Sequence, residues 1–357
     1  MKEYSPYCSV DEASELVACC LAKNVPFYVC RYPGEVSCRF GAQTQGVPSM
    51  SIDNGFRAVP FDITGDAKPF TIHPDLFPQD IDRLHAMLPR CAEWQELSGA
   101  DMEYSTYLDT AQSLIDRMQH GDVAKVVLSR TITRDCDTLN FLPSYFARLC
   151  RFYPSAYVFM VSYPGVCGWV GATPEVLLQS HNGGYATMAL AGTRAVGVDA
   201  PWGEKEVREQ QYVTQYISDI LRSHNLNDVV VNTHTRQAAQ VEHLCTHFDI
   251  TTQHDTAVRD RLVASLHPTP AVAGTPTQVA MLAIGESEPH SRRYYGGYVG
   301  EAFDDGRCGL YVNLRSMEFT PDAVRLYVGG GLTAQSVATD EWNETCAKSQ
   351  TLLKAFQ

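Results

Sequence analysis

The sequence lacks the excess of positive charge that proteins need to bind polyanionic surfaces. It contains 28 Lys and Arg residues and 41 Asp and Glu residues, which gives a net charge of -13. Because no basic surface is concentrated enough to meet phosphates, we exclude nucleic acid and anionic membranes as partners. An anionic small molecule would have to be bound by local cationic groups or by a metal ion.

Long apolar runs and a secretory start are lacking as well. No apolar stretch approaches the roughly 18 residues that a membrane span needs, and Met1 to Val10 carry no apolar core of signal-peptide length. The 12 cysteines include no CxxC pair, the usual beginning of a zinc site, and most lie singly within apolar segments. We therefore expect reduced cysteines and a cytoplasmic protein.

No internal repeat, low-complexity segment or linker divides the chain of 357 residues. Such a length suits two domains or one large α/β unit. Hydrophobic residues at 45% and charged residues at 19% are typical of a globular protein. We expect one compact α/β unit built of two lobes, in which the first 100 residues contain no site-like cluster.

The stretch from Val328 to Lys348 is the most informative part of the chain. An apolar run typical of a strand leads into three glycines, which we interpret as a loop whose bare N–H groups can hold an anion. Thr339 or Asp340 is expected to cap the helix that follows. Three charged side chains share one face of this helix: Glu341, Glu344 and Lys348. The pattern predicts a metal-assisted site for an acidic molecule, and the alternative is a solvated helix face after an ordinary turn.

Three further charged residues stand at positions typical of catalytic groups. Lys125 opens an apolar strand, where it is either solvated or buried as a neutral amine that can act as a general base. Glu175 follows Pro174 at a break between strands, so it is either a general acid or a surface turn residue. Glu209 lies on the apolar face of a helix predicted over 204–223, where its carboxylate needs a partner. Together with the two later glutamates, it would offer carboxylate ligands to magnesium.

The anion-binding groups are expected on the strands. Arg315 lies in a predicted strand over 309–317, and an inward guanidinium there needs either an anionic ligand or a structural acid. Gly192 and Thr193 follow a short predicted strand, where an N–H and a hydroxyl could meet a carboxylate. We predict consecutive antiparallel strands over 294–301, 309–317 and 323–328. No nucleophilic serine or cysteine, nucleotide loop or redox centre is indicated, so the chemistry left is hydration, protonation or displacement.

In their order along the chain, these motifs resemble the chorismate-utilising enzymes. That family comprises isochorismate synthases, salicylate synthases and the large subunits of anthranilate and aminodeoxychorismate synthases. The matching motifs include Lys-Val-Val-Leu-Ser-Arg from 125, Gly-Ala-Thr-Pro-Glu ending at 175, Ala-Gly-Thr-Arg from 191, Lys-Glu-x-x-Glu ending at 209, Leu-His-Pro-Thr-Pro-Ala-Val-x-Gly from 266 and Glu-x-x-Glu-x-x-x-Lys from 341.

The resemblance covers about residues 120 to 350 and implies an α/β fold of the anthranilate synthase component I type. Such a fold has large, mostly antiparallel sheets with helices packed outside, in two intertwined lobes. Residues 1–100 would be a variable N-terminal part of the same fold, and residues 101–357 the chorismate-binding catalytic region.

Within the family, the motifs are most similar to those of isochorismate synthases. Ammonia-using members typically carry glutamine at the position of Lys125, so no glutaminase subunit is expected and the chain is compatible with a monomer. Residues 266–274 match the isochorismate synthase version of that loop. A salicylate synthase that also eliminates pyruvate remains an alternative, as does an inactive chorismate-binding protein. Whether the product serves menaquinone, siderophore or salicylate synthesis is left open.

The resemblance also implies roles for individual residues. Lys125 would activate water for attack at C2 of chorismate, and Glu175 would protonate the departing C4 hydroxyl to give isochorismate. Magnesium would be held by Glu209 and Glu344, with Glu341 alongside. The remaining substrate contacts would be Gly192, Thr193, His267, Tyr295, Arg315, Gly329, Gly330, Gly331 and Lys348. The chain departs from the family at Gln210, where a histidine usually stands.

Overall fold

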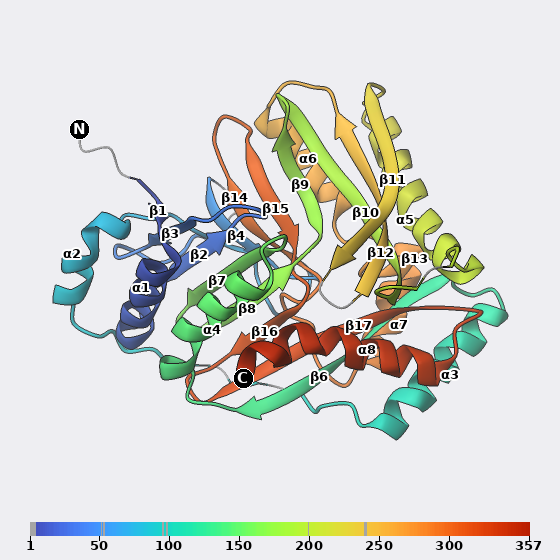
Figure 1. Ribbon diagram of the computed structural model, residues 1–357, viewed down its shortest axis with the longest axis horizontal. Helices are drawn as coiled ribbons and strands as arrows, with labels where there is room; N and C mark the ends of the chain where they lie inside the picture. The colour runs from blue at the N-terminus through green and yellow to red at the C-terminus, as the bar shows by residue number, and fades with distance from the viewer. Residues whose placement is uncertain are drawn as a thin grey trace.

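Two β-sheets packed face to face form the centre of the molecule, and helices cover the outer face of each sheet (Figure 1). The computed structural model describes residues 5–50, 52, 54–94, 96–97, 99–198, 200–238 and 241–357. All pairings between neighbouring strands of these ranges are antiparallel. The prediction of large antiparallel sheets with helices packed outside is confirmed.

The first sheet has nine strands in the order β1-β3-β2-β7-β8-β16-β17-β6-β13. Their bounds are β1 (Tyr7–Cys8), β3 (Cys38–Ala42), β2 (Phe27–Arg31), β7 (Tyr157–Tyr163), β8 (Cys167–Thr173), β16 (Ser316–Phe319), β17 (Ala323–Thr333), β6 (Lys125–Asp135) and β13 (Gly274–Thr275). Strands β7 and β8 follow one another in the chain and pair as an antiparallel hairpin.

The second sheet has eight strands in the order β11-β12-β10-β9-β15-β14-β4-β5. Their bounds are β11 (Val229–Ala238), β12 (Val241–Ile250), β10 (Gly184–Ala195), β9 (Val176–His181), β15 (Cys308–Val312), β14 (Tyr298–Ala302), β4 (Gly55–Val59) and β5 (Phe70–Ile72). The long strands β10, β11 and β12 stand together on one side of the molecule in Figure 1, with α5 beside them.

The helices divide between the two outer faces. Their bounds are α1 (Val10–Lys23), α2 (Ile81–Ala86), α3 (Tyr104–Gln119), α4 (Thr138–Phe152), α5 (Glu204–Ser223), α6 (Thr256–Leu266), α7 (Thr277–Ser287) and α8 (Ala338–Leu353). Helices α1 and α4 pack on the nine-stranded sheet, and α5 and α6 pack on the eight-stranded one. Among the described helices, none is both long and apolar enough to cross a membrane.

The core between the sheets is rich in aromatic side chains. The rings of Tyr157 on β7 and Tyr311 on β15 stack at 4.0 Å between centroids, which joins the two sheets directly. Successive residues of β2 alternate between this core and the outer one, so Tyr28 faces the second sheet while Val29 faces the helices. A fully buried strand of this kind reads as a continuous apolar run, as Phe27 to Cys30 does.

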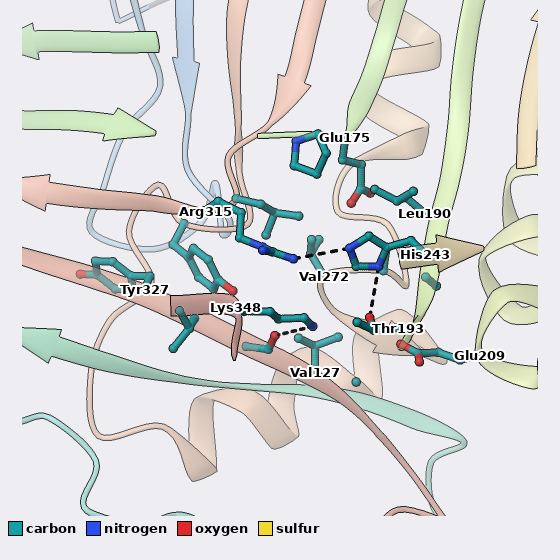
Figure 2. Close-up of a pocket in the computed structure, with 18 residues that line it drawn as sticks. Val127, Glu175, Leu190, Thr193, Glu209, His243, Val272, Arg315, Tyr327 and Lys348 are labelled. Carbon is teal, nitrogen blue, oxygen red and sulfur yellow. Dashed lines mark hydrogen bonds between the residues drawn. The ribbon is translucent and has the colours of Figure 1, made fainter. Parts of the chain in front are cut away.

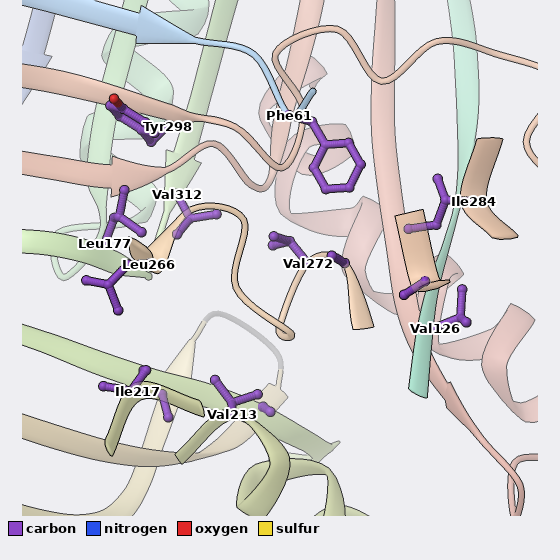
Figure 3. Close-up of a cluster of buried hydrophobic side chains, with 14 of the residues drawn as sticks. Phe61, Val126, Leu177, Val213, Ile217, Leu266, Val272, Ile284, Tyr298 and Val312 are labelled. Carbon is purple, nitrogen blue, oxygen red and sulfur yellow. The ribbon is translucent and has the colours of Figure 1, made fainter. Parts of the chain in front are cut away.

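A separate apolar cluster fixes the segment that leads from α6 to α7. Val272 lies at its centre in Figure 3, with Val213 and Ile217 of α5 on one side and Ile284 of α7 on another. All four side chains are at most 5% exposed. The three prolines of this segment each lack a backbone donor, so its regular structure is limited to β13 (Gly274–Thr275), and packing of this kind holds the rest against the sheets.

The chain passes repeatedly from one sheet to the other. Strands β1 to β3 enter the nine-stranded sheet, β4 and β5 the eight-stranded one, β6 to β8 the first again and β9 to β12 the second. Later, β14 and β15 lie in the eight-stranded sheet, whereas β16 and β17 lie in the other. The two predicted lobes are therefore intertwined, and the first 100 residues contribute strands to both sheets.

The structure corrects several predicted local features. The glycines at 329–331 form no loop: they continue β17 and pair with Val127 to Ser129 of β6. Helix α8 begins at Ala338 after the N-cap Val337, so the predicted capping by Thr339 or Asp340 is wrong. The predicted strand over 309–317 is interrupted at the point where the chain changes sheets, between β15 and β16. The strand predicted from 294 begins only at Tyr298.

Candidate active site

A cavity of about 690 Å³, including the part open to solvent, lies where the two sheets meet. Strands β10 and β12 form one wall, β17 and α8 another, and the segment before α7 a third. Many of the predicted site residues line it: Glu175, Thr193, Glu209, Tyr295, Arg315, Gly329, Gly331 and Lys348. These residues come from distant parts of the chain, and the fold brings them together.

Lys125 lies behind the cavity wall and pairs with Glu209, which lines it. The Lys125 side chain is fully buried, and its Nζ is 3.0 Å from Glu209 Oε1. The contact is an ion pair without the directionality of a hydrogen bond. A Cβ on Gly331 would lie 2.9 Å from Lys125 Cε and 2.4 Å from Glu209 Oε1, so the glycine leaves the space that this pair occupies. The partner that the sequence required for Glu209 is therefore Lys125.

Glu175 enters the cavity from the opposite side, just before β9. Figure 2 shows its carboxyl across the cavity from Glu209 and Lys348. The side chain is nearly fully buried, and burial raises the pKa of Glu175 to about 8 against the opposing effect of nearby cations. A carboxyl with this pKa is protonated at neutral pH, the state that a general acid requires.

Arg315 lies between β15 and β16, where the chain passes from one sheet to the other, and its φ is 48°. Its Nη1 donates to Thr351 Oγ1 at 2.9 Å, and its Nη2 lies 3.5 Å from the ring of His243 (Figure 2). That ring in turn contacts Thr193 Oγ1 at 3.1 Å. Among the described residues no carboxylate forms an ion pair with Arg315, so its buried charge is available to an anionic ligand.

Lys348 supplies a second cation on the cavity floor. Its Nζ pairs with Glu344 Oε1 at 2.6 Å and donates to the carbonyl oxygen of Gly329 at 3.0 Å. The spacing of the two side chains on α8 is the one the sequence predicted. Because Gly329 belongs to β17, the lysine also ties the helix to the strand.

Glu341 is the most deeply buried of the three carboxylates predicted to hold magnesium. Its Oε1 pairs with Lys205 Nζ at 2.5 Å, and its Oε2 is buried without a hydrogen-bond partner. Burial, and then the charge of Glu344, raises the pKa of Glu341. A Cβ on Gly330 would lie 3.3 Å from Glu341 Oε2 and 3.8 Å from Glu344 Oε1, so the glycine opens space beside both carboxylates.

These observations fit a divalent cation, although each carboxylate here has a lysine partner. Over the described ranges, no three side chains of His, Cys, Asp or Glu converge closely enough to hold a metal ion as they stand. The unpartnered oxygen of Glu341 and its repulsion by Glu344 are what a bound cation would relieve. Glu209, Glu341 and Glu344 therefore remain the candidate ligands.

Gln210, which stands where the family resemblance implies a histidine, is buried and hydrogen-bonded at both ends of its amide. Its Oε1 accepts from the backbone N–H of Ala191 at 2.9 Å, and its Nε2 donates to the carbonyl oxygen of Ala189 at 3.1 Å and to Thr246 Oγ1 at 2.9 Å. These bonds hold β10 where its register shifts, next to Gly192 with its φ of 51°. Both polar atoms of the Gln210 amide are therefore engaged in hydrogen bonds that support the cavity wall.

Of the predicted site residues, Lys125, Gly330, Glu341 and Glu344 are not part of the cavity lining, and neither are His267 and Gly192. His267 packs against Tyr298 and its Nε2 contacts the carbonyl oxygen of Pro60 at 3.0 Å, while burial lowers its pKa to about 4. Gly192 lies just behind Thr193, where a Cβ would be 2.8 Å from the carbonyl oxygen of Glu206. Gly192 lies between Ala191 and Thr193, which line the cavity, whereas His267 packs outside it.

The family model for chorismate-binding enzymes matches residues 78–357. The chain belongs to this family. Isochorismate synthase EntC of Escherichia coli K12 is 31% identical over 246 residues, which cover 66% of this chain and 62% of that protein. Anthranilate synthase component 1 of Thermus thermophilus is 29% identical over 271 residues, 72% of this chain and 58% of that one. The chain thus matches less than two thirds of the length of either relative.

Solved structures of chorismate-binding enzymes share the fold. MenF, the menaquinone-specific isochorismate synthase of Escherichia coli, superposes with a TM-score of 0.78 at 20% identity over 98% of this chain and 91% of that one. Anthranilate synthase component I of Streptococcus pneumoniae gives a TM-score of 0.66 at 20% identity, over 92% and 90%. The predicted anthranilate synthase component I-like fold is confirmed.

His243 of β12, which no sequence pattern singles out, lies among the polar groups of the cavity. Burial, and then the charge of Arg315, lowers its pKa well below the usual range, so the ring is neutral at neutral pH. Its only signal in the sequence is a polar residue on the inward face of an alternating strand. A single histidine in such a place is more often structural than functional, so the pattern could not single it out.

Proposed function

We propose that the protein is an isochorismate synthase that converts chorismate to isochorismate. Membership of the chorismate-binding family supports the substrate, and several relatives of about 30% identity carry this activity in their names. The cavity supports the dianionic substrate class because two cations, Arg315 and Lys348, line it. An acidic protein can bind a dianion in this way through a few local positive groups.

The reaction exchanges one hydroxyl for another with a shift of double bonds. Water adds at C2 of the ring and gives up a proton, the double bonds move, and the C4 hydroxyl leaves as water after it accepts a proton. The Glu175 carboxyl, kept protonated by its burial, can supply the second proton. On the other side of the ring, the Lys125–Glu209 pair can take the first one.

The proposal rests mainly on the position of Glu175 across the cavity from Glu209, which Figure 2 shows, and on the pairing of Glu209 with Lys125 behind the cavity wall. A protonated carboxyl on one side and a lysine–carboxylate pair on the other are what the exchange of hydroxyls needs. No covalent intermediate is required, which agrees with a cavity lining whose described residues include neither serine nor cysteine.

Magnesium is part of the proposal. Glu209, Glu341 and Glu344 would hold it, and it would neutralise a carboxylate of the substrate and so orient the ring. Arg315 and Tyr295 would hold the other carboxylate, since both line the cavity next to each other. We assign water, and not ammonia, as the attacking molecule because Lys125 stands where ammonia-using members of the family typically carry glutamine.

Product analysis tests the proposal most directly. We expect purified protein incubated with chorismate and magnesium, without ammonia, to give isochorismate in equilibrium with chorismate in the NMR spectrum. Salicylate with pyruvate would instead indicate a salicylate synthase, and formation of an aminated product only when ammonia is added would indicate the ammonia-using branch. A folded protein that binds chorismate without turnover would be a binding protein.

A further inference from the structure

A narrow crevice opens beside the cavity and shares Pro174 and Arg315 with it. Arg236 of β11 lines the crevice as well, and none of the described residues around it is an aspartate or a glutamate. The chain has 41 acidic residues and a net charge of -13, so a crevice with two arginines and no acid is a local exception. Neither the sequence motifs nor the proposed mechanism uses Arg236.

The register of the sheet turns Arg236 toward the cavity. Arg236 on β11 is directly opposite His243 on β12, which is opposite Thr193 on β10. Directly opposed residues of antiparallel strands project from the same face, with Cβ atoms about 5 Å apart. Since Thr193 and His243 line the cavity, Arg236 is the next side chain of the same row, on the outermost strand of the sheet.

The guanidinium of Arg236 is not neutralised by an acid. Its Nη1 lies 3.4 Å from Met188 Sδ, and the Cys245 thiol is its other neighbour. Sulfur atoms are weak acceptors and carry no compensating charge. Over the ranges that the structure describes, no carboxylate comes within ion-pair distance of Arg236, and its charge reaches as far as Glu175 and His243.

We propose that this crevice is an anion-binding subsite that receives a carboxylate of the incoming substrate at Arg236 before Arg315 binds it. The subsite rests on the proposed function only in that the substrate is a dicarboxylate. A chain of net charge -13 repels a dianion at a distance, and an unpaired cation at the rim offsets this repulsion locally. Arg315, at 9% exposure, is too deeply buried to make the first contact.

The variant Arg236→Gln tests the subsite through the salt dependence of turnover. Rim charges affect the capture of a ligand and its dependence on ionic strength more than the chemical step. We expect kcat/KM for chorismate at low salt to fall by about five- to tenfold, with kcat changed much less. Between about 20 and 300 mM KCl, where screening becomes strong, kcat/KM of the variant should decline less steeply than that of the unaltered protein.

Two further variants separate this effect from a general loss of charge. Arg134→Gln removes the same charge from an exposed arginine on the far part of β6, whose guanidinium donates a hydrogen bond to the carbonyl oxygen of Thr133. It should leave both kcat/KM and its salt slope unchanged. Arg236→Lys keeps the charge and should retain most of the salt dependence. Equal kcat/KM and equal slopes for Arg236→Gln and Arg134→Gln would overturn the proposal.

A binding measurement distinguishes failure of the subsite from failure of the proposed function. Calorimetric titration with benzene-1,3-dicarboxylate, an unreactive ring dicarboxylate, needs no turnover. We expect its Kd to rise about fivefold in Arg236→Gln and not in Arg134→Gln. Absence of chorismate turnover in the unaltered protein would refute the synthase assignment alone, whereas equal Kd values for the two variants would refute the subsite even if turnover is found.

Discussion

The Glu175 carboxyl is surrounded by cations, yet its burial favours the neutral form more strongly. Lys125, Lys348, Arg236 and Arg315 all lower its pKa, and burial still raises it to about 8. The same cations that favour a dianionic ligand therefore keep the acid close to neutral pH, where proton transfer is most effective. A less buried carboxyl among these charges would be ionised and could not donate a proton.

This balance predicts the pH dependence of the enzyme. Because the protonated form of Glu175 is the active one, we expect kcat/KM to fall as the pH rises through about 8. Glu175→Gln keeps the shape and removes the acidic proton, so its turnover should drop by about two to four orders of magnitude while the circular dichroism spectrum is retained. Full activity of this variant, or a kcat/KM profile that stays level above pH 8, would contradict the assigned role.

At the residue scale, the sequence showed which side chains are unusual but not which of them meet. Glu209 clearly needed a partner on an apolar helix face, yet nothing in the order of residues pointed to Lys125, 84 positions away in the chain. His243 could not be distinguished from a structural histidine. Both relationships depend on strands and helices that meet only through the tertiary fold.

The three glycines of β17 form part of a sheet and still create the cavity floor. Their pairing with β6 places them opposite Val127 to Ser129, and the space that their missing side chains leave is taken by the Lys125–Glu209 pair and by the carboxylates of α8. The sequence predicted that something approaches these glycines closely. The predicted loop at these positions was wrong, because glycine is more typical of loops than of strand interiors.

Substitution of one of these glycines tests their role. In Gly331→Ala the new methyl group would lie 2.4 Å from Glu209 Oε1 and 2.9 Å from Lys125 Cε, so the two side chains of this ion pair must shift from their positions. We expect chorismate turnover to fall by about a hundredfold or more, with the fold retained in the circular dichroism spectrum. Gly285→Ala is the matched control, because its Cβ would meet nothing within 4 Å, and it should turn over chorismate normally. Similar activities for the two variants would show that the space beside Gly331 is not needed.

Prediction at the element scale succeeded where periodicity was unbroken and failed where the chain changes sheets. Helix α5 has the predicted bounds, Glu204–Ser223, because its apolar stripe is regular. The predicted strand over 309–317 combined two strands of different sheets, since the alternation of apolar residues continues past Val312 up to Leu314. The break between the two strands, where Arg315 lies, does not interrupt this alternation and so could not be predicted from it.

On the scale of the whole molecule, a buried charge on β14 joins the two sheets. Glu301 is 2% exposed, accepts hydrogen bonds from Tyr28 at 3.1 Å and Tyr32 at 3.0 Å, and pairs with Arg39 Nε at 2.9 Å. These three partners belong to β2, β3 and the turn between them, in the other sheet. Together they connect the N-terminal strands with the C-terminal half of the chain.

Removal of this carboxylate should weaken the whole fold. We expect Glu301→Ala to lower the free energy of unfolding in urea by about 3 to 5 kcal/mol, because it leaves a mostly buried arginine and two phenolic hydroxyls unpaired. Glu286→Ala breaks the exposed pair with Arg117 and should cost less than about 1 kcal/mol. Equal losses in the two variants would mean that the buried pair does not hold the sheets together.

The passage of the chain between the sheets has a consequence for its synthesis on the ribosome. Strands β16 and β17 fill the middle of the nine-stranded sheet, between β8 and β6, although they lie more than 140 residues after β8 begins. Before β16 and β17 have left the ribosome, the edges of β8 and β6 are unpaired. Such open edges can pair with other chains unless chaperones shield them. This late part of the chain also carries Arg315 just before β16, the glycines of β17 and, on α8, Lys348. A nascent chain in which α8 is still inside the ribosome therefore lacks Lys348 and cannot complete the cavity.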